Sequence, residues 1–192
     1  MWTLPANWFA AHRLSDMATV LILPGWQGSG PEHWQMHWVR QHGHTVVEQD
    51  NWLRPRRGDW LARLDEVIID TPGRVVLAAH SLGCIQVAAW AAVSRHTARV
   101  AGALLVAPGD VEAPHLREQL PGWSPIVRKK LPFASILVGS QNDPFCSADK
   151  AQALARDWGA EWVDLGLAGH INADTQLGDW PAGQALLSRF LN

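Results

Sequence analysis

The sequence predicts a three-layer α/β sandwich with a mainly parallel central sheet of about six strands. Two observations support this fold class. Short apolar runs typical of β-strands alternate along the chain with longer stretches at helical spacing, which is the pattern of parallel strands joined by crossover helices. In addition, residues 75–79 read Val-Val-Leu-Ala-Ala without a polar interruption, as expected for a strand buried on both faces of a parallel sheet.

The individual elements follow from this alternation. Strands are expected where the apolar runs lie, at residues 19–23, 45–48, 74–79, 100–107, 134–139 and 161–165. Helices are expected where apolar residues recur at helical spacing, at residues 32–41, 59–69, 82–93, 148–158 and 181–190. Pro181 opens the last of these helices, because a proline is tolerated at the first helical position.

Residues 108–132 interrupt the alternation. Several prolines make this connection too irregular for a single crossover helix. It directly follows a strand, at the end where α/β proteins bind ligands, so we expect a partial lid rather than a plain surface loop. Trp123 is then expected to form a wall of the substrate pocket.

Composition limits the class of protein. The chain has 192 residues, 47% hydrophobic content and a formal net charge of −2, which predict one globular domain without a field that attracts nucleic acid. Cys84 and Cys146 are the only cysteines and are expected to be free thiols in a reducing compartment. No stretch is long and apolar enough for a membrane span, and the start of the chain is a poor signal peptide, so a cytoplasmic location is expected.

The chain start is expected to lie outside the domain. Met17 directly precedes the first predicted strand, so residues 1–16 are interpreted as an N-terminal extension, either disordered or created by a misplaced start codon. Residues 17–192 are interpreted as the single α/β domain.

A serine lies in the turn between the third predicted strand and its helix. In "AAHSLGC", small residues flank Ser81 two positions before it, at Ala79, and two positions after it, at Gly83. This is the G-x-S-x-G nucleophile elbow with alanine in its first place, which holds the serine in a strained turn and exposes its hydroxyl at a helix N-terminus. The alternative is a serine that only occupies a tight turn, where serine is common.

A nucleophilic serine needs a base and an acid. In the chain order Ser, Asp, His, the histidine that follows a strand in a glycine-bearing loop is His170, in "DLGLAGHIN". Asp143, in "SILVGSQNDPFCS" after the fifth predicted strand, is the expected acid, and Asp110 after the fourth is the reserve. Either aspartate could instead only begin a turn.

Backbone donors for an oxyanion are expected beside the serine. The amide of Leu82 follows the nucleophile directly. In "LILPGWQGSG", Gly25 allows the backbone to approach the pocket, and the amide of Trp26 is the expected second donor.

Four motifs in this order and spacing, "LPGWQGS", "AAHSLGC", "GSQNDPFCS" and "AGHINADTQLGDWP", resemble the small α/β-hydrolases of the retinoblastoma-binding serine hydrolase and YdeN type. The resemblance runs from about Val20 to near the C-terminus. It implies an α/β-hydrolase fold without a separate cap domain, and Ser81 as nucleophile, Asp143 as acid and His170 as base. It also implies an intracellular hydrolase of carboxyl esters or related acyl compounds that needs no metal or cofactor.

Thr175 and Gln176 depart from the family pattern, because related chains often carry Ser and Gly at these places. The detailed shape of the last loop therefore does not follow from the resemblance.

The expected function is serine hydrolysis of small carboxyl esters through an acyl-enzyme, with amide cleavage open to the same apparatus. The expected partner is a small acyl substrate or an acylated surface residue, and the oligomeric state is left open. The alternative is a non-catalytic protein-binding module on a hydrolase scaffold. Two other readings are disfavoured: the glycines after the first strand are spaced unlike a dinucleotide site, and His33 and His37 lack a clear third zinc ligand.

Overall fold

The computed structural model describes residues 18–191, so the N-terminal extension expected at residues 1–16 lies outside the described residues. The strands are β1 (Thr19–Leu23), β2 (Thr45–Val46), β3 (Val75–His80), β4 (Val100–Val106), β5 (Ala134–Gly139) and β6 (Glu161–Asp164). The helices are α2 (Trp34–His42), α3 (Arg57–Asp70), α4 (Leu82–Ala91), α5 (Pro114–Gln119), α6 (Ala148–Trp158) and α7 (Pro181–Ser188).

Within residues 18–191, one six-stranded sheet has the order β2-β1-β3-β4-β5-β6, and every neighbouring pair is parallel. The predicted parallel sheet is confirmed. Its register pairs Leu23 with Ala79 and His80 with Val106, so the carboxyl ends of the central strands meet at one edge. Loops that follow these strands are therefore brought together, as expected for a site in an α/β fold.

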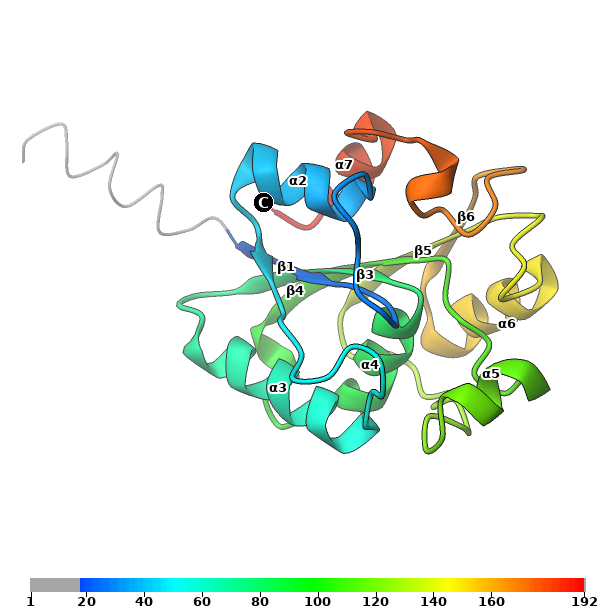
Figure 1. Ribbon diagram of the computed structural model, residues 1–192. Coiled ribbons are helices and arrows are strands. Elements are labelled where there is room, and N and C mark those ends of the chain that lie inside the picture. The colour runs from blue at the N-terminus through cyan, green and yellow to red at the C-terminus, as the bar shows by residue number, and fades with distance from the viewer. Residues whose placement is uncertain (1–17, 192) are drawn as a thin grey trace, which may run out of the picture.

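Successive side chains along each central strand belong alternately to two apolar clusters. Leu21, Leu77 and Leu105 belong to one cluster, with side chains of α3, α4 and α6. Their neighbours along the strands, such as Ile22 and Leu104, belong to the other cluster, with side chains of α2 and α7. Figure 1 shows the sheet between these two helix layers, with α2 and α7 on one side and α3 and α4 on the other. This confirms the three-layer sandwich.

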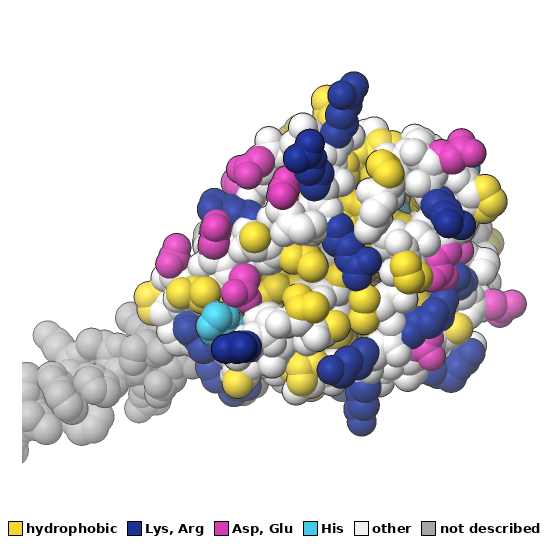
Figure 2. Space-filling model, turned by 90° about the horizontal axis from the view of Figure 1, so that it is seen from below, with side chains coloured by type: hydrophobic (Ala, Val, Ile, Leu, Met, Phe, Trp, Pro, Cys, Tyr) yellow, Lys and Arg dark blue, Asp and Glu magenta, His cyan; other side chains and the backbone are white. Residues whose placement is uncertain are grey.

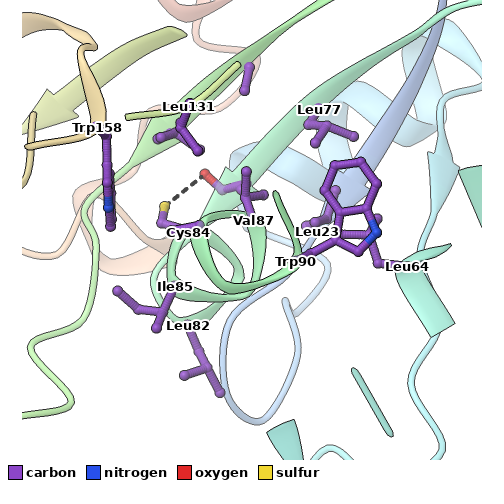
Figure 3. Packing of buried hydrophobic residues seen from close by; sticks show 14 of the residues in the cluster. Leu23, Leu64, Leu77, Leu82, Cys84, Ile85, Val87, Trp90, Leu131 and Trp158 are labelled. Atoms are coloured by element: carbon purple, nitrogen blue, oxygen red, sulfur yellow. Dashed lines mark hydrogen bonds between the residues drawn. The ribbon is translucent and has the colours of Figure 1, made fainter. Parts of the chain in front are cut away.

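Helix α4 packs as a buried helix beneath the sheet. Every residue from Leu82 to Trp90 is buried, because apolar and small side chains surround this helix on all sides. Figure 3 shows Ile85, Val87 and Trp90 among the leucines of the neighbouring strands and helices. The Cys84 thiol is also buried, and burial raises its pKa above the usual range of a thiol. The helix that follows Ser81 is thus fixed in the core.

The irregular connection at residues 108–132 contains one short helix, α5, and residues 18–191 include no separate cap domain. Ion pairs tie it to α6: Lys150 Nζ lies 2.7 Å from Glu112 Oε2, and Arg128 lies 2.8 Å from Asp157. Leu116 of α5 lines the cavity beside Ser81, so this connection does border the site, as a partial lid would.

The surface carries both signs of charge. Figure 2 shows basic and acidic side chains interspersed over one face, with apolar atoms between them. This agrees with the formal net charge of −2. Between residues 18 and 191, no helix combines the length and the hydropathy that crossing a membrane requires.

Candidate active site

Ser81 occupies a strained turn between β3 and α4. Its φ of 52° and ψ of −118° lie outside the regions that a residue with a side chain favours. A conformation of this kind costs about 1–3 kcal/mol and persists only where the surroundings enforce it. The Ser81 amide donates to the carbonyl oxygen of Val106 at 3.0 Å, which ties the turn to β4.

Gly83 explains how the turn can be so tight. A Cβ at this position would lie 2.4 Å from the carbonyl oxygen of Leu23 and 3.0 Å from that of Pro24. Only glycine therefore allows α4 to approach the end of β1 this closely. The sequence reading of Ser81 and Gly83 as parts of an elbow agrees with this geometry.

Three side chains from distant segments form one hydrogen-bonded row. His170 Nε2 lies 2.9 Å from Ser81 Oγ, and His170 Nδ1 lies 2.9 Å from each carboxylate oxygen of Asp143. The side chain of Asp143 is 2% exposed and that of His170 is 10% exposed, so water barely reaches the pair. A carboxylate beside Nδ1 places the ring proton on that nitrogen and leaves Nε2 free to accept the serine proton.

Asp110, the reserve acid, lies elsewhere. Its carboxylate is 3.3 Å from Lys150 Nζ and accepts the Glu112 amide at 3.1 Å. Asp143 also accepts the Phe145 amide at 2.9 Å, which orients its carboxylate within its own loop. The structure therefore brings Asp143, and not Asp110, to His170.

The loop that carries His170 is held by residues that the sequence reading did not select. His80 Nε2 lies 2.9 Å from the carbonyl oxygen of His170, and Trp34 Nε1 donates to the carbonyl oxygen of Ile171 at 2.9 Å. His80 directly precedes the serine in "AAHSLGC", so a polar residue at the end of an otherwise apolar strand was the signal that could have drawn attention to it.

A cavity of about 400 Å³ opens beside Ser81 and His170. This is within the range of small-molecule sites. Among the residues described, those that line the cavity include no Lys, Arg, Asp or Glu. They are glycines, apolar side chains, amides, histidines and the serine: Gly25, Trp26, Gln27, Gly28, Gly30, His33, His80, Ser81, Leu82, Gly109, Val111, Leu116, Leu120, Phe145, His170, Asn172 and Ala173.

Two histidines of this cavity are uncharged at neutral pH. Burial lowers the pKa of His33 to about 4, and the neighbouring His170 lowers it further in the same direction. Burial, followed by the charges of His33 and His170, holds the pKa of His80 well below its usual range. The walls around Ser81 therefore carry little charge.

The expected oxyanion donors lie at this cavity. Leu82 and Trp26 both line it. In the described part of the chain, neither backbone N–H has a protein acceptor outside regular helix and strand bonding. Gly25 faces the serine closely, because a Cβ there would lie 2.8 Å from Ser81 Cβ and 3.3 Å from Ser81 Oγ. Gly25 thus leaves space beside Ser81 that a side chain would occupy.

The prediction for Trp123 requires a correction. Trp123 does not line the cavity; it is fully buried in the core, where its ring packs edge-on against Trp60 with 5.4 Å between centroids. Its indole N–H donates to the carbonyl oxygen of Pro55 at 3.0 Å. A large apolar ring with one donor gains more from this packing and hydrogen bond than from facing an open cavity. Phe145 takes the expected place, with its ring centroid 4.6 Å from that of His170.

Comparison with known proteins decides the family. Residues 20–189 match the sequence profile of the serine hydrolases. The chain belongs to the serine hydrolase family. The resemblance to YdeN-type hydrolases is confirmed. Among curated proteins, no significant match to this sequence is found.

Solved structures share the fold of this serine hydrolase. A protein provisionally described as a YdeN-like hydrolase from Pectobacterium atrosepticum is 28% identical, with 95% of each chain covered and a TM-score of 0.79. The ydeN gene product from B. subtilis is 20% identical, with 90% of this chain and 98% of that chain covered and a TM-score of 0.73. A thermophilic esterase from Thermogutta terrifontis is 13% identical, with 91% of each chain covered and a TM-score of 0.64. The α/β-hydrolase fold expected from the sequence is thereby confirmed.

Proposed function

We propose that this serine hydrolase cleaves small, uncharged carboxyl esters, with Ser81 as nucleophile, His170 as general base and Asp143 as the acid that orients the base. The observation that carries the proposal is the position of the His170 ring, 2.9 Å from Ser81 Oγ on one side and 2.9 Å from both Asp143 oxygens on the other. This is the arrangement that activates a serine hydroxyl.

In the acylation step, Ser81 Oγ attacks the carbonyl carbon of the ester while its proton passes to His170 Nε2. The new Oγ–C bond forms, and the carbonyl electrons move onto the oxygen. When this oxyanion collapses, the bond to the leaving alcohol breaks, and His170 returns the proton to the departing oxygen. The buried carboxylate of Asp143 stabilises the imidazolium that exists between the two transfers.

In the deacylation step, water takes the place of the alcohol. His170 accepts a proton from the water as the water attacks the acyl-enzyme, and then protonates Ser81 Oγ as the Oγ–C bond breaks. The products are a carboxylic acid and the free serine, so the proton and the electron pair are accounted for without any further group.

The backbone amides of Leu82 and Trp26 would receive the oxyanion. Both border the cavity, and within residues 18–191 neither N–H has a protein acceptor outside regular helix and strand bonding. Leu82 is the first residue of α4, where the helix dipole favours negative charge. Loss of one such donor typically costs about 3–4 kcal/mol of transition-state stabilisation.

The uncharged cavity supports neutral substrates. A carboxylate or an ammonium group on the acyl chain would move from water into a cavity whose walls contain no opposite charge. Removing an unpaired charge from water costs much free energy. The volume of about 400 Å³ suits a small acyl or alcohol group. An acylated surface residue of another protein, or an amide, would have to bring a similarly neutral group to Ser81.

The likeness to the Thermogutta esterase shows the fold alone, so the ester proposal depends on the site. A panel of nitrophenyl esters tests it. We expect turnover of acetate and butyrate esters, and at least about tenfold lower kcat/KM for a hemisuccinate or a betaine ester of similar size. Equal turnover of charged and neutral esters would contradict the proposed substrate class. If the protein hydrolysed neither esters nor amides, the proposed hydrolysis itself would be contradicted.

A further inference from the structure

The segment that carries His170 has left-handed backbone on both sides of the histidine, and the strain lies at Ile171, because glycine adopts this conformation freely. Gly169 has a φ of 55° and Ile171 a φ of 49°. For a β-branched residue such as isoleucine, this left-handed conformation is a genuine outlier and costs about 1–3 kcal/mol. Ile171 is also fully buried. Such a backbone persists only if other contacts enforce it.

Two aromatic N–H groups supply these contacts, on two successive carbonyl groups. His80 Nε2 lies 2.9 Å from the carbonyl oxygen of His170, and Trp34 Nε1 lies 2.9 Å from that of Ile171. A carbonyl oxygen can only accept, so His80 carries its proton on Nε2 and is the donor. His80 is 5% exposed and Trp34 is 1% exposed, so water has little access to replace either donor.

We propose that His80 and Trp34 are positioning residues, which fix the two successive peptide groups that follow His170 and thereby hold the His170 ring between Ser81 and Asp143. The inference rests on the proposed function, because it assigns these residues to the same site. Neither side chain takes part in the proton transfers.

His80 connects the base to the nucleophile by a second route. It is the last residue of β3, and Ser81 follows it directly in the chain. The segment that carries the nucleophile therefore also donates a hydrogen bond to the backbone of the base. The two rings pack edge to face, with 4.8 Å between the centroids of His80 and His170. Trp34 belongs to α2, on one face of the sheet, so it fixes the loop relative to a different element.

We expect the loss of either hydrogen bond to lower mainly kcat. A displacement of the base by about 1 Å can reduce turnover by about 10²-fold, while substrate still enters the same cavity. A residue that only stabilised the fold would change the free energy of unfolding without this selective effect. The two roles can therefore be separated.

The His80 variants isolate the donor. His80→Phe keeps a planar ring but removes the N–H, whereas His80→Gln keeps a donor nitrogen at a similar reach. We expect His80→Phe to lower kcat for a neutral ester by about 10- to 100-fold with KM changed by less than about threefold, and His80→Gln to retain kcat within about threefold. If the two variants lose kcat equally, the donor is not what matters, and the proposal is wrong for His80.

Trp158 offers a matched control for Trp34. It is also a fully buried tryptophan whose Nε1 donates to a loop carbonyl, that of Val127 at 2.8 Å, but this loop segment carries none of Ser81, Asp143 and His170. Trp34→Phe is expected to lower kcat by about tenfold or more, and Trp158→Phe to leave it within about twofold at a comparable loss of stability. Equal losses of kcat would overturn the role of Trp34.

A readout that needs no turnover separates this inference from the proposed function. The Nδ1 proton of His170, in its hydrogen bond to Asp143, is followed by proton NMR. We expect a sharp signal in the wild type and His80→Gln, and exchange broadening or loss in His80→Phe. If the wild type hydrolysed no acyl compound, the proposed function would be wrong. The NMR signals of the wild type and the His80 variants would still test the positioning role. An unchanged signal in His80→Phe would overturn that role.

Discussion

Asp143 and His170 form a two-oxygen contact, in which each carboxylate oxygen lies 2.9 Å from the same ring nitrogen, Nδ1. The contact is nearly closed to water, since the Asp143 side chain is 2% exposed. In this position a carboxylate selects the tautomer that leaves Nε2 able to accept a proton. The comparison with Asp110, which contacts Lys150 instead, leads to the first prediction.

Asp143→Asn is expected to reduce kcat by about 10³- to 10⁴-fold, because the amide neither selects the tautomer nor stabilises the imidazolium. Asp110→Asn is the matched control. It weakens a partly exposed ion pair with Lys150, which is worth about 1 kcal/mol or less, and should leave kcat nearly unchanged. Ester kinetics of both variants decide the assignment, and a larger loss in Asp110→Asn would reverse it.

His170→Ala is expected to lower turnover of a neutral ester by about 10⁴-fold or more, because among the described residues His170 is the side chain that lies within hydrogen-bonding distance of Ser81 Oγ. KM should change little, since the ring edge contributes only part of the cavity wall. Steady-state kinetics on a short-chain nitrophenyl ester measure both constants. Near-normal turnover would remove His170 from the mechanism.

Gly83→Ala is expected to destabilise the fold by about 1–3 kcal/mol or more, because the new Cβ would lie 2.4 Å from a backbone oxygen that cannot move aside cheaply. Gly58→Ala provides the control. Gly58 lies in the first turn of α3 with open space around its Cα, so alanine there should be neutral or stabilise by up to about 1 kcal/mol. Thermal unfolding of the two variants tests the close approach of α4 to β1, and similar melting temperatures would contradict it.

The buried histidines make stability depend on pH. Burial lowers the pKa of His33 to about 4 in the folded chain, from 6.5 when exposed, so the unfolded chain binds this proton more readily. The contribution is therefore fully present above pH 6.5 and is lost as the pH falls toward 4. His80, whose pKa burial also lowers, acts in the same direction. We expect His33 to account for a loss of roughly 3 kcal/mol across this range.

His33→Asn isolates this effect. The His33 side chain caps α2 by accepting the Gln35 amide at 3.2 Å, and an asparagine oxygen can take over that bond without titrating. Denaturant unfolding at pH 7 and pH 4 should show a smaller loss of unfolding free energy in His33→Asn than in the wild type. An equal loss in both proteins would show that another group is responsible.

The sequence predicted the buried strands well because their evidence is local. Strands β1 and β5 begin and end where their apolar runs do. The predicted strand at residues 45–48 is shorter, since β2 ends at Val46 on the edge of the sheet and pairs with β1 alone. Helix α2 begins later than expected, because an imidazole, at His33, provides its N-cap, which residue preferences do not anticipate.

For the site, the order of the motifs along the chain led to Ser81, Asp143 and His170, and the structure places these three within hydrogen-bonding distance. That rule works because parallel strands end at one edge of the sheet. It could not place Trp123, since the choice between a cavity wall and the core depends on packing against Trp60, which is distant in the sequence. The hydrogen bond from the His80 ring to the His170 carbonyl spans 90 residues, so a polar residue at the end of an apolar strand draws attention to His80 but does not identify its partner.

The central claim is that the Ser81 hydroxyl is an activated nucleophile. Reaction with a fluorophosphonate, followed by mass spectrometry of the intact chain and its peptides, tests it most directly. We expect one phosphonyl group per chain, on the peptide that contains Ser81, in wild-type protein, and none in a folded Ser81→Ala variant. A wild-type protein that stays unlabelled, or a Ser81→Ala variant that is labelled equally, would contradict the account.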